Sequence, residues 1–296
     1  MTLYAPKYYK DFKCIADKCT HSCCIGWEID IDENTVELYK SLDGDYGKEI
    51  VKSIDFSDTP HFVLVENERC PHLDKNGLCR IISVYGEDHL CEICSEHPRF
   101  YNDTPRGTEV GLGMACEEAC RLILNSSSYD EIEKISGLGK ETESTAFDPT
   151  LERTHIYSVL KDYSLSYCER LQAIYKEYGV SPSLLEDREW QGIIESLEFL
   201  DTSHKELFLG YSSSLLSLAE QDVYLERALA YFIYRHCSEA CDYGEFRTAL
   251  GFCLFLERML ASIAKKVGNI ELCARIVSEE IEYSLDNTYT IKMIFQ

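Results

Sequence analysis

Ten cysteines stand in the first 120 residues of this chain, and they constrain its fold more than any other feature. They form three groups with the spacings C-x4-C-x3-C-C, C-x8-C-x11-C-x2-C and C-x3-C. The groups are Cys14, Cys19, Cys23 and Cys24, then Cys70, Cys79, Cys91 and Cys94, and then Cys116 and Cys120. Any fold of this part of the chain must therefore account for these sulfurs.

The chain is large enough to fold without disulfide cross-links. It has 296 residues, of which 45% are hydrophobic, enough for one large or two modest domains, each with a core. Residues 1–12 contain neither an apolar stretch nor a small-residue cleavage site, so we expect no secretory signal and a cytoplasmic protein. Structural disulfides are rare in that reducing compartment, so the cysteines indicate bound metal or reactive thiols.

The net charge limits the partners. The formal charge of -23 repels nucleic acid and anionic lipid and favours basic partners such as lysine-bearing proteins, although acidic residues also simply keep a protein in solution. No run of 18 apolar residues is present, which predicts no membrane-spanning helix. The sequence gives no indication of an oligomeric state.

Short elements are predicted between the cysteine groups. Asp88 is expected to cap a helix that places Cys91 and Cys94 on one face, because residues three apart are neighbours on a helix surface. A second helix over residues 116–124 places its two cysteines on one face in the same way. Residues 61–66 alternate as a strand does.

The rest of the chain is predicted to be helical. Polar and small residues mark a boundary, which predicts a cysteine-cluster domain over 1–126, a linker over 127–148 and a helical domain over 149–296. The predicted fold class is mainly α: an irregular cysteine-rich domain with short helices and a minor β element, then an antiparallel helical domain. The later cysteines fall in helical patterns typical of core packing, namely Cys168, Cys237, Cys241, Cys253 and Cys273.

The early cysteines are best explained as metal ligands. Many of them lie among charged residues, glycine and proline, where a buried apolar side chain is not expected, whereas thiolates on loops can converge on one ion or cluster. Soft thiolate sites select zinc or iron–sulfur clusters. Ten cysteines exceed one tetrahedral site, so two sites, or one site with redox-active thiols, remain open. His21 and His72 are further candidate ligands, or surface histidines.

Three motifs carry a resemblance to a known family. The Cys-Cys pair in residues 19–24 resembles the zinc- or iron-chelating cysteine-cluster domains. The closer resemblance is to the flagellin lysine-N-methylases, through Cys-Cys-Ile-Gly-Trp at 23–27, Leu-Cys-x2-Cys-x2-His-Pro-Arg at 90–99 and Ala-Cys-Glu-Glu-Ala-Cys-Arg-Leu at 115–122. These specific matches fall within the first 124 residues.

The resemblance implies an enzyme that transfers a methyl group from S-adenosylmethionine to lysine ε-amines of flagellin. It implies a [4Fe–4S] iron–sulfur cluster ahead of zinc, with all ten early cysteines as candidate ligands. The resemblance makes Trp27 and Arg99 candidate neighbours of the cofactor. The alternative interpretation is that Trp27 is a core residue and Arg99 a surface residue. No catalytic residue is identified. The alternatives are a zinc-stabilised, non-enzymatic interaction module and a redox or metal-handling protein.

Overall fold

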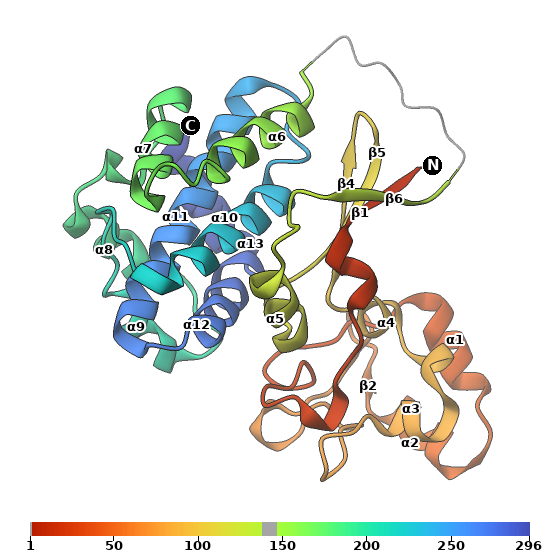
Figure 1. The fold of residues 1–296 in the computed structure, drawn as a ribbon. Helices are drawn as coiled ribbons and strands as arrows, with labels where there is room; N and C mark the ends of the chain where they lie inside the picture. Colours follow the sequence, from red (N-terminus) through yellow and green to blue (C-terminus); the bar gives the residue numbers. More distant parts are fainter. Residues whose placement is uncertain (1, 138–146) are drawn as a thin grey trace. The chain divides into compact units, whose positions relative to one another are not determined.

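The computed structural model describes residues 2–137 and 147–296 (Figure 1). The chain forms two compact units. A cysteine-rich unit comprises Lys13–Pro98, and a helical unit comprises Met1–Phe12 together with Arg99–Gln296. Thirteen α-helices and a few short strands in the described part confirm the predicted mainly α fold.

This division differs from the expected domains 1–126 and 149–296. Residues 2–12 and 99–126 belong to the helical unit, because the strand at the start of the chain pairs with strands far along it. The expected linker over 127–148 contains one of those strands, β6 (Ile132–Ser136). Residues 138–146 of that linker lie outside the described part.

The cysteine-rich unit consists of short helices around a small core. Its helices and strands are α1 (Glu33–Ser41), α2 (Gly44–Lys52), β2 (Ile54–Asp55), β3 (His61–Phe62), α3 (Arg80–Tyr85) and α4 (Glu92–Glu96), with 3-10 turns at Ala16–Lys18, Glu66–Glu68 and Glu87–His89. The core is built mainly from Ile29, Ile31, Val36, Tyr39, Ile50, Ile54, Phe62, Ile81, Cys70 and Cys91.

One aspartate ties two helices of this unit together. Asp32 caps α1 by accepting a hydrogen bond from the Thr35 N–H at 2.9 Å, and it also accepts one from the Glu92 N–H at 2.9 Å. It thereby joins the starts of α1 and α4. The predicted cap Asp88 is wrong, because it lies in the preceding 3-10 turn and Cys91 occupies the cap position of α4. The strand expected over 61–66 is only two residues long.

The helical unit contains a four-stranded sheet in the order β4-β5-β1-β6. Its strands are β1 (Leu3–Pro6), β4 (Arg99–Thr104), β5 (Gly107–Leu112) and β6. Strand β1 is parallel to β5 and antiparallel to β6, whereas β4 and β5 form an antiparallel hairpin. Strands β1, β4 and β6 were not predicted from the sequence.

Helices make up the rest of this unit. They are α5 (Glu117–Asn125), α6 (Pro149–Leu160), α7 (Tyr167–Tyr178), α8 (Asp187–Ser196), α9 (Lys205–Phe208), α10 (Asp222–His236), α11 (Tyr243–Val267), α12 (Ile270–Val277), a π-helical turn (Ser278–Glu282) and α13 (Leu285–Lys292). Short 3-10 turns lie at Lys7–Asp11, Pro182–Leu184, Thr202–His204, Ala219–Gln221 and Met293–Phe295.

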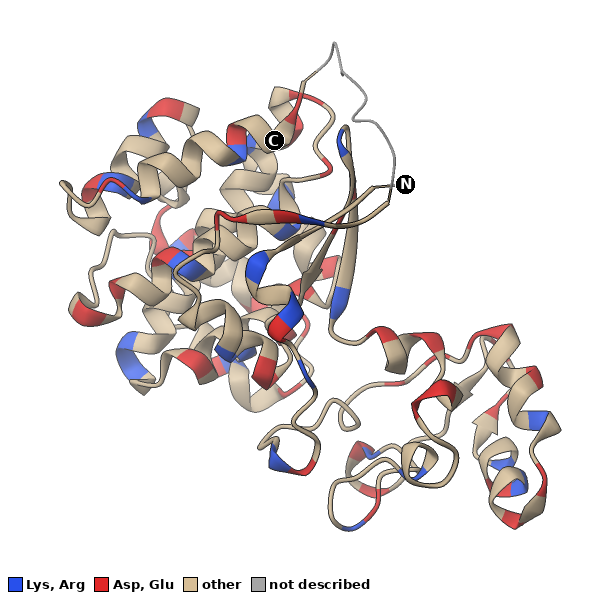
Figure 2. Cartoon of the chain, turned by 45° about the vertical axis from the view of Figure 1, so that its right-hand side comes forward, with Lys and Arg blue, Asp and Glu red and all other residues tan. Residues whose placement is uncertain are grey.

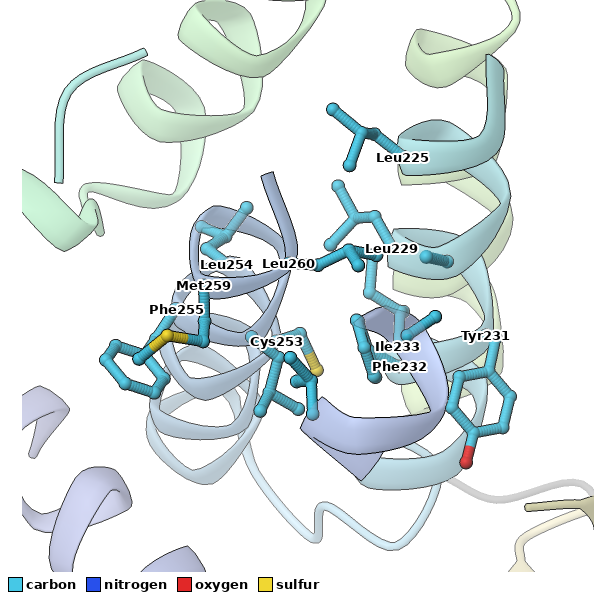
Figure 3. Packing of buried hydrophobic residues seen from close by; sticks show 14 of the residues in the cluster. Leu225, Leu229, Tyr231, Phe232, Ile233, Cys253, Leu254, Phe255, Met259 and Leu260 are labelled. Carbon is cyan, nitrogen blue, oxygen red and sulfur yellow. The ribbon is translucent and has the colours of Figure 1, made fainter. Parts of the chain in front are cut away.

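Helices α10 and α11 form the centre of the core. Figure 3 shows Leu225, Leu229 and Ile233 of α10 facing Cys253 and Leu260 of α11. All five side chains are fully buried. Only six residues connect the two helices. Such a short connection places consecutive helices side by side and antiparallel, as predicted.

The described helices include none that is long and apolar enough to cross a membrane, as predicted. Acidic residues are spread over the elements of both units and are not confined to one of them (Figure 2).

Candidate cysteine site

Six of the ten predicted ligands come together in the cysteine-rich unit. They are Cys23, Cys24, Cys70, Cys79, Cys91 and Cys94. The thiol of Cys23 is hydrogen-bonded to that of Cys24, and the thiol of Cys91 to that of Cys94. The hydrogen bond and burial raise the pKa of Cys94, while the same hydrogen bond lowers the pKa of Cys91. Each pair is therefore joined by a hydrogen bond between two sulfurs.

Cys70 connects the two pairs. Its backbone N–H donates to the Cys24 carbonyl at 2.8 Å, which holds the two loops side by side. Burial, together with negative charge on Cys79, Cys91 and Cys23, raises the pKa of the Cys70 thiol to about 11. This mutual repulsion indicates that these sulfurs lie in the same region of the cysteine-rich unit.

Two of the six cysteines stand at helix starts. Cys79 precedes α3 and Cys91 precedes α4, each at the cap position. Burial raises the pKa of Cys79, and N–H groups of Ile81 and Ile82 in the first turn act against that rise. The positive end of a helix favours an anionic sulfur, which is the form that binds metal.

In the described ranges 2–137 and 147–296, no three Cys, His, Asp or Glu side chains are arranged closely enough to hold one metal ion. Four of the six thiols are instead paired by hydrogen bonds, Cys23 with Cys24 and Cys91 with Cys94. Their chemistry fits a thiophilic group, because six sulfurs on loops and helix starts can exchange their protons for zinc or for the iron of a cluster. The donor set is therefore suitable for either.

The other four predicted ligands lie elsewhere. Cys14 is exposed, and the half-buried Cys19 donates its thiol proton to the His21 carbonyl at 2.5 Å. Cys116 and Cys120 belong to the helical unit, where Cys116 occupies the N-cap position of α5. Cys120 is buried, its thiol donates to a carbonyl at 3.4 Å, and burial raises its pKa.

His72 is excluded as a ligand by its contacts. The buried imidazole bonds Tyr46 Oη through Nδ1 at 3.2 Å and Ser53 Oγ through Nε2 at 2.9 Å. Burial lowers its pKa to about 4, so it is neutral at pH 7. Both ring nitrogens are occupied, and His72 therefore holds the core of this unit.

The two candidate cofactor neighbours occupy different units. Trp27 is half-buried and its indole N–H donates to the Cys23 carbonyl at 2.8 Å, which braces the loop that carries the first thiol pair. Arg99 begins β4, and its Nε donates to Tyr9 Oη at 3.0 Å while its guanidinium lies 5.7 Å from the centre of the Phe12 ring. Trp27 thus borders the six cysteines, whereas Arg99 packs on aromatic rings of the helical unit.

A second polar cluster was not predicted. In the helical unit, the buried Glu282 bonds His236 and Tyr231 and lies beside Arg235. These residues sit in helical patterns that look like ordinary core, and they meet only after folding.

Comparison with known proteins finds relatives at 27% identity. The lysine-N-methylases of Salmonella choleraesuis (strain SC-B67) and Salmonella typhimurium each match over 139 residues, 42% of this chain and 33% of the relative. The flagellar biosynthetic protein FliU of Salmonella muenchen matches over 132 residues, 42% of this chain and 78% of FliU.

The chain thus spans 33% of the length of the lysine-N-methylases it matches. No family model and no solved structure matches it. Over 42% of its length the chain is thus similar to proteins named lysine-N-methylase and FliU, which agrees with the resemblance of its cysteine motifs.

Proposed function

We propose that this protein is a cytoplasmic lysine N-methyltransferase acting on flagellin or a similar lysine-bearing protein, with S-adenosylmethionine as methyl donor and an iron–sulfur cluster as cofactor. The observation that carries the proposal is the gathering of six thiols in one unit of a chain whose relatives are named lysine-N-methylases. The relatives' names support the methyl transfer, and the sulfurs support the cluster.

The cluster would be held by thiolates of the cysteine-rich unit. Its ligands would come from Cys23, Cys24, Cys70, Cys91 and Cys94, together with Cys79 at the start of α3. An iron–sulfur cluster supplies iron that can bind ligands and exchange electrons. The hydrogen-bonded pairs Cys23–Cys24 and Cys91–Cys94 would lose their thiol protons on loading.

The substrate amine sets the second requirement. A lysine ε-amine must be neutral to attack a methyl group, and its pKa in water is about 10.4, so the enzyme must accept its proton or lower its pKa. The net charge of -23 favours encounter with a cationic segment of the substrate at low ionic strength. We therefore expect the rate of methylation at limiting substrate to fall as salt is added.

Oxygen-free purification tests the cofactor. A brown protein with iron, acid-labile sulfide and a broad visible absorption band supports the cluster. A colourless protein that retains zinc through dialysis would exclude the cluster and favour a zinc-stabilised interaction module. Rapid loss of metal to glutathione would favour metal handling.

Mass spectrometry of the substrate tests the activity. The brown protein is incubated with purified flagellin and S-adenosylmethionine, and we expect flagellin peptides heavier by whole methyl groups on lysine. The matched control replaces the methyl donor with S-adenosylhomocysteine, which has no methyl group to transfer. Unchanged flagellin in the presence of a loaded cluster and donor would reject the enzyme.

A further inference from the structure

A cavity lies in the helical unit where α10 ends and α11 begins. Its volume is about 570 Å³, and the last turn of α13 closes one side of it. Cavities of this size commonly hold small molecules, which a few polar groups orient. The polar side chains that line this one are His236, Glu239, Asp242, Glu245, Arg247 and Lys292.

Three carboxylates of the lining have no cationic partner. Glu239 accepts a hydrogen bond from a backbone N–H at 3.5 Å, Asp242 accepts one at 2.9 Å and Glu245 accepts one at 2.8 Å. Within residues 2–137 and 147–296 none of the three forms an ion pair. Their negative charge is therefore available to an ammonium group that enters the cavity.

Two cations of the lining likewise have only neutral partners. Arg247 donates to the backbone carbonyls of residues 178 and 179, at 2.8 and 3.1 Å. The Nζ of Lys292 lies 5.3 Å from the centre of the Phe252 ring. In the part of the chain that the structure describes, neither cation pairs with a carboxylate. Charges of both signs thus surround one cavity without pairing with one another.

His236 presents a hydrogen-bond acceptor. Its Nε2 lies 2.6 Å from Oε1 of the buried Glu282. Burial opposes the ionisation of Glu282, but the charge of Arg235 and this hydrogen bond outweigh it and lower the pKa of Glu282. Burial lowers the pKa of His236 to about 4, so the imidazole is neutral at pH 7. Because an ionised carboxylate only accepts, Nε2 carries the imidazole proton and Nδ1 is an acceptor.

This acceptor faces the cavity close to Lys292. Among the described residues Nδ1 has no hydrogen-bond partner, and it is not sealed from solvent. The side chain of His236 is only 9% exposed, so its accessible edge is the edge that lines the cavity. The centre of the Phe252 ring lies 4.9 Å from the imidazole centre, so His236 and Lys292 contact the same ring. The charge of Lys292 also acts on His236.

We infer that this cavity binds a free α-amino acid, with its ammonium group on His236 Nδ1 and its carboxylate on Lys292. An acceptor and a cationic donor that lie close together match the two groups on one α-carbon. The unpaired charges of both signs favour a zwitterion, because a ligand with one charge is repelled by part of the lining. The site belongs to the helical unit alone and does not depend on the proposed methyl transfer.

Calorimetry on the full-length, oxygen-free protein tests this binding. Each common L-amino acid is titrated singly, and we expect at least one to bind with a dissociation constant below about 1 mM. For that amino acid, two derivatives are then titrated: the N-acetyl form, which has no ammonium group, and the decarboxylated amine. Each should bind at least about tenfold more weakly than the amino acid, because each loses a charge-assisted hydrogen bond.

A lysine variant separates the carboxylate contact from other effects. Lys292→Met keeps an apolar chain and removes the charge, so it should weaken binding of the amino acid at least about tenfold and leave that of the decarboxylated amine unchanged. Lys265→Met is the matched control, because Lys265 also lies in the last turn of its helix but does not line the cavity. It should bind like the wild type.

A histidine variant tests the ammonium contact. His236→Gln places an amide N–H where Nε2 stood, so it retains a donor to Glu282 and removes the acceptor at Nδ1. It should weaken binding of the amino acid about tenfold and leave the N-acetyl form unaffected. Circular dichroism should show native helix content, and the lysine variant decides the matter if this one does not fold.

Three results would overturn the inference. The first is that no amino acid binds at about 10 mM. The second is that the amino acid and both derivatives bind equally, because the charged groups then make no contact. The third is that Lys292→Met weakens the amino acid and the decarboxylated amine alike. Methylation of flagellin is measured separately, so none of these results bears on the proposed function.

Discussion

Arg153 and Glu109 form a two-point ion pair in the core of the helical unit. Arg153 Nη1 lies 2.6 Å from Glu109 Oε2, and Nη2 lies 2.6 Å from Oε1. Glu109 belongs to β5 and Arg153 to α6, and Ser238, after α10, accepts from the arginine at 2.7 Å and donates to the glutamate at 3.0 Å. One network thus joins the sheet to two helices.

Breaking this pair should cost much stability. Glu109→Ala leaves the Arg153 charge buried without its partner, and we expect the free energy of unfolding to fall by about 3–5 kcal/mol. Urea denaturation followed by circular dichroism measures it. The control Lys40→Ala removes an exposed ion pair with Glu37 and should stay within about 0.5 kcal/mol of the wild type. A loss as small as the control's would contradict the pairing.

Two helical glycines should respond in opposite directions to alanine. A Cβ at Gly251 in α11 would lie 2.4 Å from Phe295, so Gly251→Ala should destabilise by about 1–3 kcal/mol through overpacking. Gly192 in α8 has nothing within 4 Å of that position, so Gly192→Ala should stabilise by about 0.5–1 kcal/mol. Thermal unfolding measures both, and equal shifts would refute the packing of Phe295 on α11.

His204 should make the helical unit less stable at alkaline pH. A hydrogen bond from its Nδ1 to Glu280 at 2.6 Å raises the pKa of His204, and the charges of Glu280, Asp201 and Glu279 act in the same direction against burial. The folded state therefore binds the proton more tightly than the unfolded state.

The sign of the pH effect follows from this linkage. The contribution of His204 is complete below the unfolded pKa of about 6.5 and is lost as pH rises through the higher folded pKa. His204→Gln should flatten the decline of stability over that window, measured by urea denaturation at several pH values. The exposed pair of His155 with Glu177 provides the control, because His155→Gln should change the slope little. An unchanged slope in His204→Gln would rule out this linkage.

The cysteines can be sorted by their effect on metal content. Cys91→Ser and Cys94→Ser each remove one sulfur of a hydrogen-bonded pair, and we expect iron per protein, measured on oxygen-free material, to fall by at least about tenfold. Cys241→Ser changes an exposed cysteine of the helical unit and should retain full iron. Full iron in all three variants would remove Cys91 and Cys94 from the ligand set.

Local patterns were sufficient for the helices. The helical domain predicted over 149–296 contains α7 and α11, because three-four spacing of apolar residues depends only on neighbours along the chain. The resemblance carried by the cysteine motifs was likewise confirmed by the relatives.

Strand pairing could not be predicted in this way. Leu3 in β1 pairs with Thr108 in β5 and with Ser136 in β6, so that strand depends on partners far along the chain. A four-residue segment carries too short an alternation to be recognised alone. This pairing is also what assigns residues 2–12 to the helical unit instead of the cysteine-rich one.

The cysteines show both sides of this distinction. The number of cysteines and their polar loop sequences were enough to predict metal-binding or reactive thiols. Core packing does not explain a cysteine in a polar loop, whereas metal ligation does. The chain could not show that Cys23 and Cys24 meet Cys70, Cys91 and Cys94 within one unit, since a backbone hydrogen bond between loops 46 residues apart holds them there. The distance between two residues far apart in the sequence depends on how the backbone between them folds, and the spacing of the residues alone does not give it.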